Sequence, residues 1–239
     1  MRETSMPGYY LVCQMPLLIL DRVTRNYQSD TAAVAALRDV SLAVEPGEFI
    51  AIVGRSGCGK TTLLNLSGAM DFPSSGEVRI DGISTSGLSD ARLTRMRRTQ
   101  VGFIFQLFHL LPTLTVAENV ELPLLLDGKS NTRAPALDRL RWLEMEEFAH
   151  RMPHQLSGGQ MQRVAIARAL VHSPKLLLAD EPIGNLDTIT GNTVIALLRK
   201  ISRELGTAVL MATHSLESAA TCDAIIRLRD GHIEGIERR

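Results

Sequence analysis

Residues 48–62 read EFIAIVGRSGCGKTT, and this stretch decides the fold. Its first residues are the apolar run of a buried strand, and residues 54–61 fit the pattern G-x-x-x-x-G-K-[ST]. A helix is expected directly afterwards, over residues 59–70. The glycines let the backbone curl so that successive N–H groups face one centre, and the start of the helix adds partial positive charge there. The stretch therefore predicts a phosphate-binding loop between a strand and a helix.

The side chains of this loop suit a nucleotide. Lys60 offers a point charge to the β- and γ-phosphates, Thr61 offers a hydroxyl to Mg²⁺, and Thr62 is placed to reach the α-phosphate. Cys58 is interpreted as a small residue that fits the loop, and a redox-sensitive thiol is the alternative. We expect the whole loop to bind nucleotide: Gly54, Arg55, Ser56, Gly57, Cys58, Gly59, Lys60, Thr61 and Thr62.

Strands and helices alternate through most of the chain. Strands are expected at residues 17–24, 41–44, 48–54, 77–80, 101–106, 175–180, 207–213 and 224–228. Helices are expected at residues 59–70, 157–172, 188–205 and 216–221. This alternation predicts an α/β fold with a parallel sheet and helices on its faces. Residues 107–173 are mostly helical and are predicted to form an inserted helical subdomain.

A hydrophobic strand ends in two acidic residues in the segment LLLADE, residues 176–181. Ligands bind beyond the carboxyl ends of strands in such sheets, so Asp180 is placed to hold Mg²⁺ and Glu181 to act as general base on the attacking water. A solvated acidic turn is the alternative for this pair alone. Combined with the phosphate loop, the segment indicates a nucleotide hydrolase of the P-loop class.

The segment LSGGQ, residues 156–160, narrows the class. Ser157 is a good helix N-cap, and the two glycines leave backbone N–H groups open to a phosphate. With this segment the chain resembles ATP-binding-cassette (ABC) nucleotide-binding subunits over about residues 17–236. The resemblance implies that Ser157, Gly158, Gly159 and Gln160 face the γ-phosphate held by a second subunit, so that ATP joins two chains.

The resemblance also implies roles for four further residues. Tyr27 stacks on adenine, although by itself it is equally a packing residue of a sheet, and Gln106 contacts Mg²⁺ or the attacking water. Asp187 belongs to the loop that links the two active sites, and His214 contacts the γ-phosphate. The predicted catalytic residues are Lys60, Gln106, Glu181 and His214, and the predicted metal ligands are Thr61, Gln106 and Asp180.

The resemblance is strongest to the subgroup for lipoprotein release, macrolide-type export and the related division-associated ATPases. The fragments that carry it are VGFIFQ at 101–106, LLP at 110–112, TVAENV at 115–120 and GNLD at 184–187. Ile183 and Ser215 depart from the usual Thr and Asp of this subgroup. The fold then expected is a P-loop NTPase α/β core with a mainly parallel sheet, an N-terminal antiparallel β subdomain and the inserted helical subdomain. Residues 17–239 would form this domain, after a disordered leader at 1–16 with translation starting at Met15.

The implied function is hydrolysis of Mg-ATP by a homodimer that drives a separate membrane permease. The chain would lie peripherally at the cytoplasmic face of the cell membrane, where residues 107–115 receive the permease, with a periplasmic adaptor as a further partner. Export or lipoprotein release is the main expectation. The alternative is an ABC ATPase that drives a non-transporting membrane regulator of cell-wall enzymes. DNA-repair cassettes need long coiled coils, for which the interval from Lys60 to Asp180 has no room.

The composition argues against several other classes of protein. Lys plus Arg balance Asp plus Glu at 26 each, which gives no general attraction to nucleic acid. The cysteines Cys13, Cys58 and Cys222 are scattered, which argues against a disulfide framework or a zinc site. No apolar run reaches the ~18–20 residues of a membrane helix, so another protein would have to hold the chain at a membrane.

Overall fold

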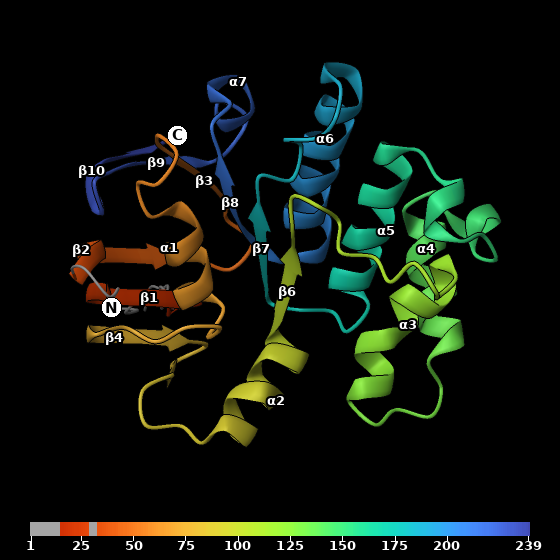
Figure 1. Cartoon of the computed structure of the whole chain (residues 1–239), viewed down its shortest axis with the longest axis horizontal. Helices are drawn as coiled ribbons and strands as arrows, with labels where there is room; N and C mark the ends of the chain where they lie inside the picture. The colour runs from red at the N-terminus through yellow and green to blue at the C-terminus, as the bar shows by residue number, and fades with distance from the viewer. Residues whose placement is uncertain (1–14, 29–32) are drawn as a thin grey trace, which may run out of the picture.

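A computed structural model of the chain describes residues 15–28 and 33–239. The predicted leader falls largely outside these residues, because only Met15 and Pro16 of it are described. The described chain forms two sheets and a group of helices (Figure 1). None of the helices in these residues is both long and apolar enough to cross a bilayer.

The strands are β1 (Leu18–Gln28), β2 (Ala33–Val44), β3 (Phe49–Val53), β4 (Ser75–Ile80), β5 (Ile83–Ser84), β6 (Val101–Ile104), β7 (Leu176–Asp180), β8 (Ala208–Thr213), β9 (Ala224–Arg229) and β10 (His232–Arg238). The helices are α1 (Lys60–Ser67), α2 (Asp90–Gln100), α3 (Val116–Leu126), α4 (Arg133–Trp142), α5 (Gly158–Leu170), α6 (Thr188–Leu205) and α7 (Leu216–Ala219). Two short 3₁₀ turns, at Glu146–Phe148 and Pro153–Gln155, connect α4 to α5.

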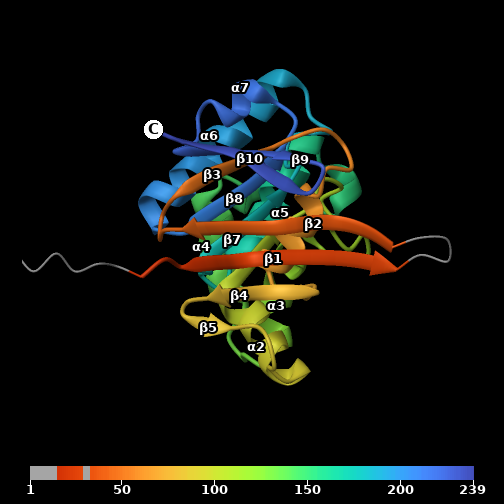
Figure 2. The same ribbon diagram turned by 90° about the vertical axis from the view of Figure 1, so that its left-hand side faces the viewer.

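The larger sheet has the strand order β10-β9-β3-β8-β7-β6, and its five strands from β9 to β6 are parallel. β10 returns antiparallel to β9 through a hairpin turn at Asp230-Gly231, in which both residues have positive φ. The smaller sheet, β2-β1-β4-β5, is antiparallel, and its long strands β1 and β2 run across one side of the molecule (Figure 2). The predicted fold class is confirmed.

One predicted strand is much longer than expected. Residues 41–44 are the end of β2, which begins at Ala33. The buried residues Leu37 and Val40 precede Leu42, but Arg38 and Asp39 between them break the alternation of apolar and polar residues. Asp39 has a φ of 51°, and the pairing of β1 with β2 shifts register in this region. The irregular strand therefore lacks the period-two pattern that identifies a strand in sequence.

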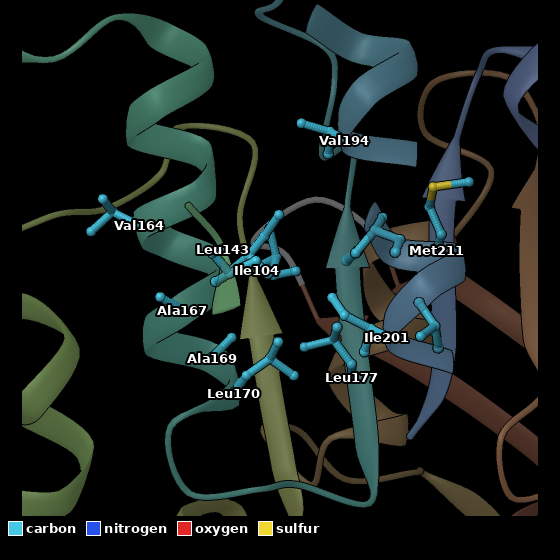
Figure 3. Close-up of a cluster of buried hydrophobic side chains, with 14 of the residues drawn as sticks. Ile104, Leu143, Val164, Ala167, Ala169, Leu170, Leu177, Val194, Ile201 and Met211 are labelled. Atoms are coloured by element: carbon cyan, nitrogen blue, oxygen red, sulfur yellow. The ribbon is translucent and has the colours of Figure 1, made fainter. Parts of the chain in front are cut away.

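The larger sheet separates two hydrophobic clusters, because successive side chains of each strand point to opposite faces. On β3, Phe49 and Ala51 join the cluster that packs on α5 and α6, whereas Ile50 and Ile52 join the cluster shared with α1 and the antiparallel sheet. Figure 3 shows the first cluster, where Leu170 of α5 lies beside the strand residues. Two filled faces hold the strands rigidly, which fixes the residues at their carboxyl ends.

The helices α3, α4 and α5 gather at the β6 edge of this sheet (Figure 1). The buried side chain of Asn119 in α3 fastens the preceding loop: its amide donates to the carbonyls of Leu111, Leu114 and Thr115, and its Oδ1 accepts from the Leu111 N–H at 2.7 Å. Residues 107–173 thus contain these three helices, as predicted from their pattern. We propose that residues 107–173 form a separate subdomain inserted into the α/β core.

Candidate functional site

A cleft of about 470 Å³ opens beyond the carboxyl ends of β3, β7 and β8. We call it the phosphate cleft. Ten of the predicted site residues line it: Ser56, Gly57, Gly59, Lys60, Thr61, Thr62, Gln106, Asp180, Glu181 and His214. They come from four separate parts of the chain, and Ala36 adds a fifth. The parallel sheet brings them together, because the carboxyl ends of its strands lie at one edge.

The loop between β3 and α1 forms the floor of the cleft. Gly59 has a φ of 109°, and a Cβ added there would lie 2.5 Å from the carbonyl oxygen of Ala36, so only glycine fits. The buried Lys60 ammonium donates to the carbonyls of Gly54 at 2.8 Å and Arg55 at 3.3 Å. The loop backbone thus holds Lys60 at the point where the start of α1 provides free N–H groups, which suits a phosphate.

Two oxygen ligands suited to Mg²⁺ meet at one side of the cleft. The hydroxyl of Thr61 donates to Oδ2 of Asp180 at 2.9 Å, and Gln106 lines the same cleft. Hydroxyl, carboxylate and amide oxygens are the ligands that hard divalent cations prefer. The residues therefore fit Mg²⁺, with the remaining ligands left to phosphate and water.

The carboxylate of Glu181 lies between the imidazole of His214 and the ammonium of Lys60. Its Oε2 is 2.9 Å from Nδ1 of His214, and its Oε1 is 3.9 Å from the Lys60 ammonium. Glu181 has a φ of 47°, a conformation that a non-glycine residue adopts only where its surroundings impose it. The chain turns out of β7 at this residue, and the carboxylate is held at the cleft, where a water next to a bound phosphate would lie.

Gln106 follows β6 and is held by a residue that sequence reasoning missed. The side-chain amide of Asn185 donates to the Gln106 carbonyl at 3.0 Å, and a Cβ on the neighbouring Gly184 would lie 3.0 Å from Nε2 of Gln106. In the sequence, the GNLD fragment that contains both indicates the subgroup and the loop that links two active sites, but not a contact with Gln106. Ala36, which also lines the cleft, carries no chemical signal in the sequence.

The LSGGQ segment lies outside the phosphate cleft. Ser157 caps α5: its hydroxyl accepts from the Gln160 N–H, and the Gln160 side chain accepts from the Ser157 N–H at 2.8 Å. Ser157, Gly159 and Gln160 line a second hollow of about 410 Å³, which they share with the start of α6. A single chain therefore holds the two predicted nucleotide-contacting motifs apart.

Five other predicted residues do not line the cleft. Tyr27 lies near the end of β1, where its hydroxyl donates to Asp71 at 2.6 Å and the Arg25 guanidinium lies over its ring. Asp187 caps α6, and hydrogen bonds from Thr190 hold the pKa of its carboxyl below the ordinary value. Cys58 is buried behind the loop, where it lines a separate hollow with Gly54 and the exposed Arg55. Its burial agrees with a packing role.

The family model described as ABC transporter matches residues 37–184. An uncharacterised ABC transporter ATP-binding protein of Methanocaldococcus jannaschii, MJ0796, is 46% identical over 228 residues, which cover 93% of this chain and 97% of that protein. The lipoprotein-releasing system ATP-binding protein LolD 2 of Caulobacter vibrioides is 45% identical over 222 residues, 92% of this chain and 97% of that protein. The macrolide export ATP-binding/permease protein MacB of Burkholderia pseudomallei is 47% identical over 222 residues, 92% of this chain but 34% of that protein.

A solved structure is similar over nearly the whole chain. It is the dimeric post-hydrolysis state of the ATP-binding cassette MJ0796 bound to ADP and Pi. Its TM-score with this chain is 0.85 at 45% identity, and the match covers 92% of this chain and 98% of that chain.

Proposed function

Because the chain belongs to the ABC transporter family, as an ATP-binding subunit and ATPase, we propose that two identical copies clamp two Mg-ATP molecules between them. Each ATP would lie in the phosphate cleft of one copy and against the LSGGQ segment of the other. The observation that carries this proposal is the separation of the two motifs within one chain: α5 presents its capped N-terminus in a hollow apart from the cleft. A second copy is what would bring them together. The dimeric MJ0796 cassette supports this arrangement.

The residues of the cleft then have distinct tasks. Glu181 orients and deprotonates the attacking water, and His214, 2.9 Å away, contacts the γ-phosphate. The Lys60 ammonium leaves its two carbonyl partners for the β- and γ-phosphate oxygens. Thr61, Asp180 and Gln106 would hold Mg²⁺, which supplies positive charge to the phosphate oxygens when it is bound. The partner subunit's LSGGQ segment adds backbone N–H groups at the γ-phosphate.

In this proposal, ATP hydrolysis by the dimer drives a membrane permease that is a separate chain. We propose export or lipoprotein release, with the chain at the cytoplasmic face of the membrane and residues 107–115 against the permease. The relatives LolD and MacB support this subgroup, because their names assign them to lipoprotein release and macrolide export. The exposed side chains of Leu107 and Leu111 offer apolar contact area on that surface. A periplasmic adaptor would complete an export assembly.

The experiment that tests the clamp compares wild type with Glu181→Gln by size-exclusion chromatography, with and without Mg-ATP, and by ATPase rate. The carboxamide keeps the size of the side chain but cannot take the proton, so kcat should fall by roughly 10²–10⁴-fold. The variant should also elute as a dimer with Mg-ATP. A variant that stays monomeric and hydrolyses ATP like the wild type would refute both the clamp and the role of Glu181.

A further inference from the structure

Arg168 joins α5 to the loop that carries Gln106. Its guanidinium donates from Nη2 to the carbonyl of Phe108 at 2.7 Å and from Nη1 to the carbonyl of His109 at 2.5 Å. The two carbonyls belong to consecutive residues, so the planar fork of the guanidinium contacts both at once. Arg168 lies in the last turn of the helix, 60 residues along the chain from Phe108.

The loop that accepts hydrogen bonds from Arg168 has an unfavourable backbone conformation at Phe108 and His109. Phe108 and His109 have φ values of 59° and 49°, in the left-handed region, although neither is glycine. The loop is nonetheless compact, because the N–H of Phe108 donates to the Phe105 carbonyl and the Phe105 ring lies 4.7 Å from the His109 ring. Consecutive left-handed residues persist only where outside contacts impose them. The two hydrogen bonds from Arg168 are such contacts.

The Arg168 guanidinium has no acidic partner among the described residues that would explain its position. It is half-buried, and this burial lowers its pKa, although an arginine stays charged at neutral pH. Even partial burial of a cation without an ion pair costs free energy, so packing stability alone does not favour the arrangement. Its two hydrogen bonds therefore point to a positional task.

From these contacts we propose that Arg168 is a positioning residue that sets where Gln106 stands in the phosphate cleft. The proposal rests on the function proposed above for that cleft. Asn185 fixes the Gln106 carbonyl from one side, and Arg168 fixes the two residues that follow Leu107 from the other. Ser157 caps the other end of the same helix α5, roughly 16 Å away at 1.5 Å per residue. A rigid helix thus connects the LSGGQ segment to the Gln106 loop of its own chain.

The test uses the full chain with Arg168→Ala and Arg168→Lys, and with Arg139→Ala as the matched control. Arg139 lies on α4 and is also partly buried with a lowered pKa, but it donates to Ser173 and does not contact the loop. Amide hydrogen exchange of residues 105–110 is measured without nucleotide, and kcat and KM for ATP are measured with Mg²⁺.

Arg168→Ala should speed exchange in residues 105–110 by at least about 10-fold while exchange in the sheet stays as in the wild type. It should lower kcat by roughly 10-fold or more with KM within about twofold, because Gln106 is displaced and the nucleotide-binding loop is not. Arg168→Lys should be intermediate, since one ammonium replaces the fork. Arg139→Ala should leave the exchange of residues 105–110 unchanged.

The proposal is overturned if exchange in residues 105–110 is unchanged, if exchange rises equally throughout the chain, or if the loop is released while kcat stays as in the wild type. Should Arg168→Ala fail to fold, the same three criteria apply to Arg168→Lys. A wild-type protein that hydrolyses no ATP would instead refute the proposed function, and the exchange measurement would still show whether Arg168 holds the loop.

Discussion

The hydroxyl of Thr61 donates a 2.9 Å hydrogen bond to Oδ2 of Asp180, although the two residues are 119 positions apart in the chain. One follows β3 at the start of α1, and the other ends β7, so β8 lies between their strands in the sheet. Both are proposed ligands of the same ion. Because the sheet places the two oxygens within 2.9 Å of each other, little rearrangement is needed for both to contact one Mg²⁺ ion.

Asp180→Asn should therefore separate nucleotide binding from hydrolysis. The amide removes the charge that favours a divalent cation, so kcat should fall by at least about 100-fold and the Mg²⁺ concentration for half-maximal activity should rise. Binding of ATP without Mg²⁺ should persist, because Lys60 and the loop are intact. Thr61→Ser, which keeps the hydroxyl, is the control and should retain most of the activity. An Asp180→Asn enzyme with a normal Mg²⁺ dependence would exclude Asp180 as a ligand.

Gly184→Ala should affect activity rather than stability. A Cβ at Gly184 would lie 3.0 Å from Nε2 of Gln106, which is the far end of a flexible and exposed side chain. The Gln106 side chain can move aside at little cost, so the melting temperature should change by no more than about 2 °C. Its displacement from the cleft should lower kcat by roughly 3- to 10-fold. Gly235→Ala, where an added Cβ meets no atom within 4 Å, is the control for both measurements. Unchanged kcat in Gly184→Ala would mean that the rotamer of Gln106 is unimportant.

Most of the phosphate cleft could be predicted from sequence, because its residues occur in short contiguous motifs. The loop from Gly54 to Thr62 and the pair Asp180 and Glu181 are each identified by local spacing, and the sheet places the ends of parallel strands together. Gln106 and His214 needed the family resemblance as well, since a single polar residue after a strand has no motif of its own. The roles of all these residues stay predictions until the variants are measured.

The contacts between the motifs could not be predicted, because they depend on tertiary packing. Nothing in the sequence near Arg168 indicates that it reaches Phe108, 60 residues away, or that Asn185 donates to the Gln106 carbonyl. The hydrogen bond from the Tyr27 hydroxyl to Asp71 is likewise absent from the sequence pattern, and the stacking on adenine that the family resemblance implies for Tyr27 stays a prediction. Sequence patterns identify the residues with chemical roles. The residues that hold them in place by hydrogen bonds lie in distant segments and belong to no recognisable sequence motif for that role.

His172 should make stability depend on pH. Its Nε2–H donates to the Val101 carbonyl at 3.1 Å, and its Nδ1 is buried without a partner in the described residues. Burial lowers the pKa of His172, and nearby Lys129 and Arg139 lower it further, while the Val101 carbonyl and Asp127 oppose the shift. The folded state therefore favours the neutral ring, whose Nδ1 needs no proton.

Proton binding at His172 determines how the free energy of unfolding changes with pH. Below the ordinary histidine pKa of about 6.5, the unfolded chain binds a proton at His172 that the folded chain does not, so the free energy of unfolding falls as the pH falls from there towards the lowered pKa. Urea unfolding of wild type and His172→Gln at pH 7.5 and pH 5.5 measures this. Gln keeps a donor for Val101, so the two proteins should differ by no more than about 1 kcal/mol at pH 7.5. The wild type should lose more stability than the variant on acidification, because the other histidines contribute equally to both. Equal losses would show that His172 accepts its proton as readily in the folded protein as in the unfolded one.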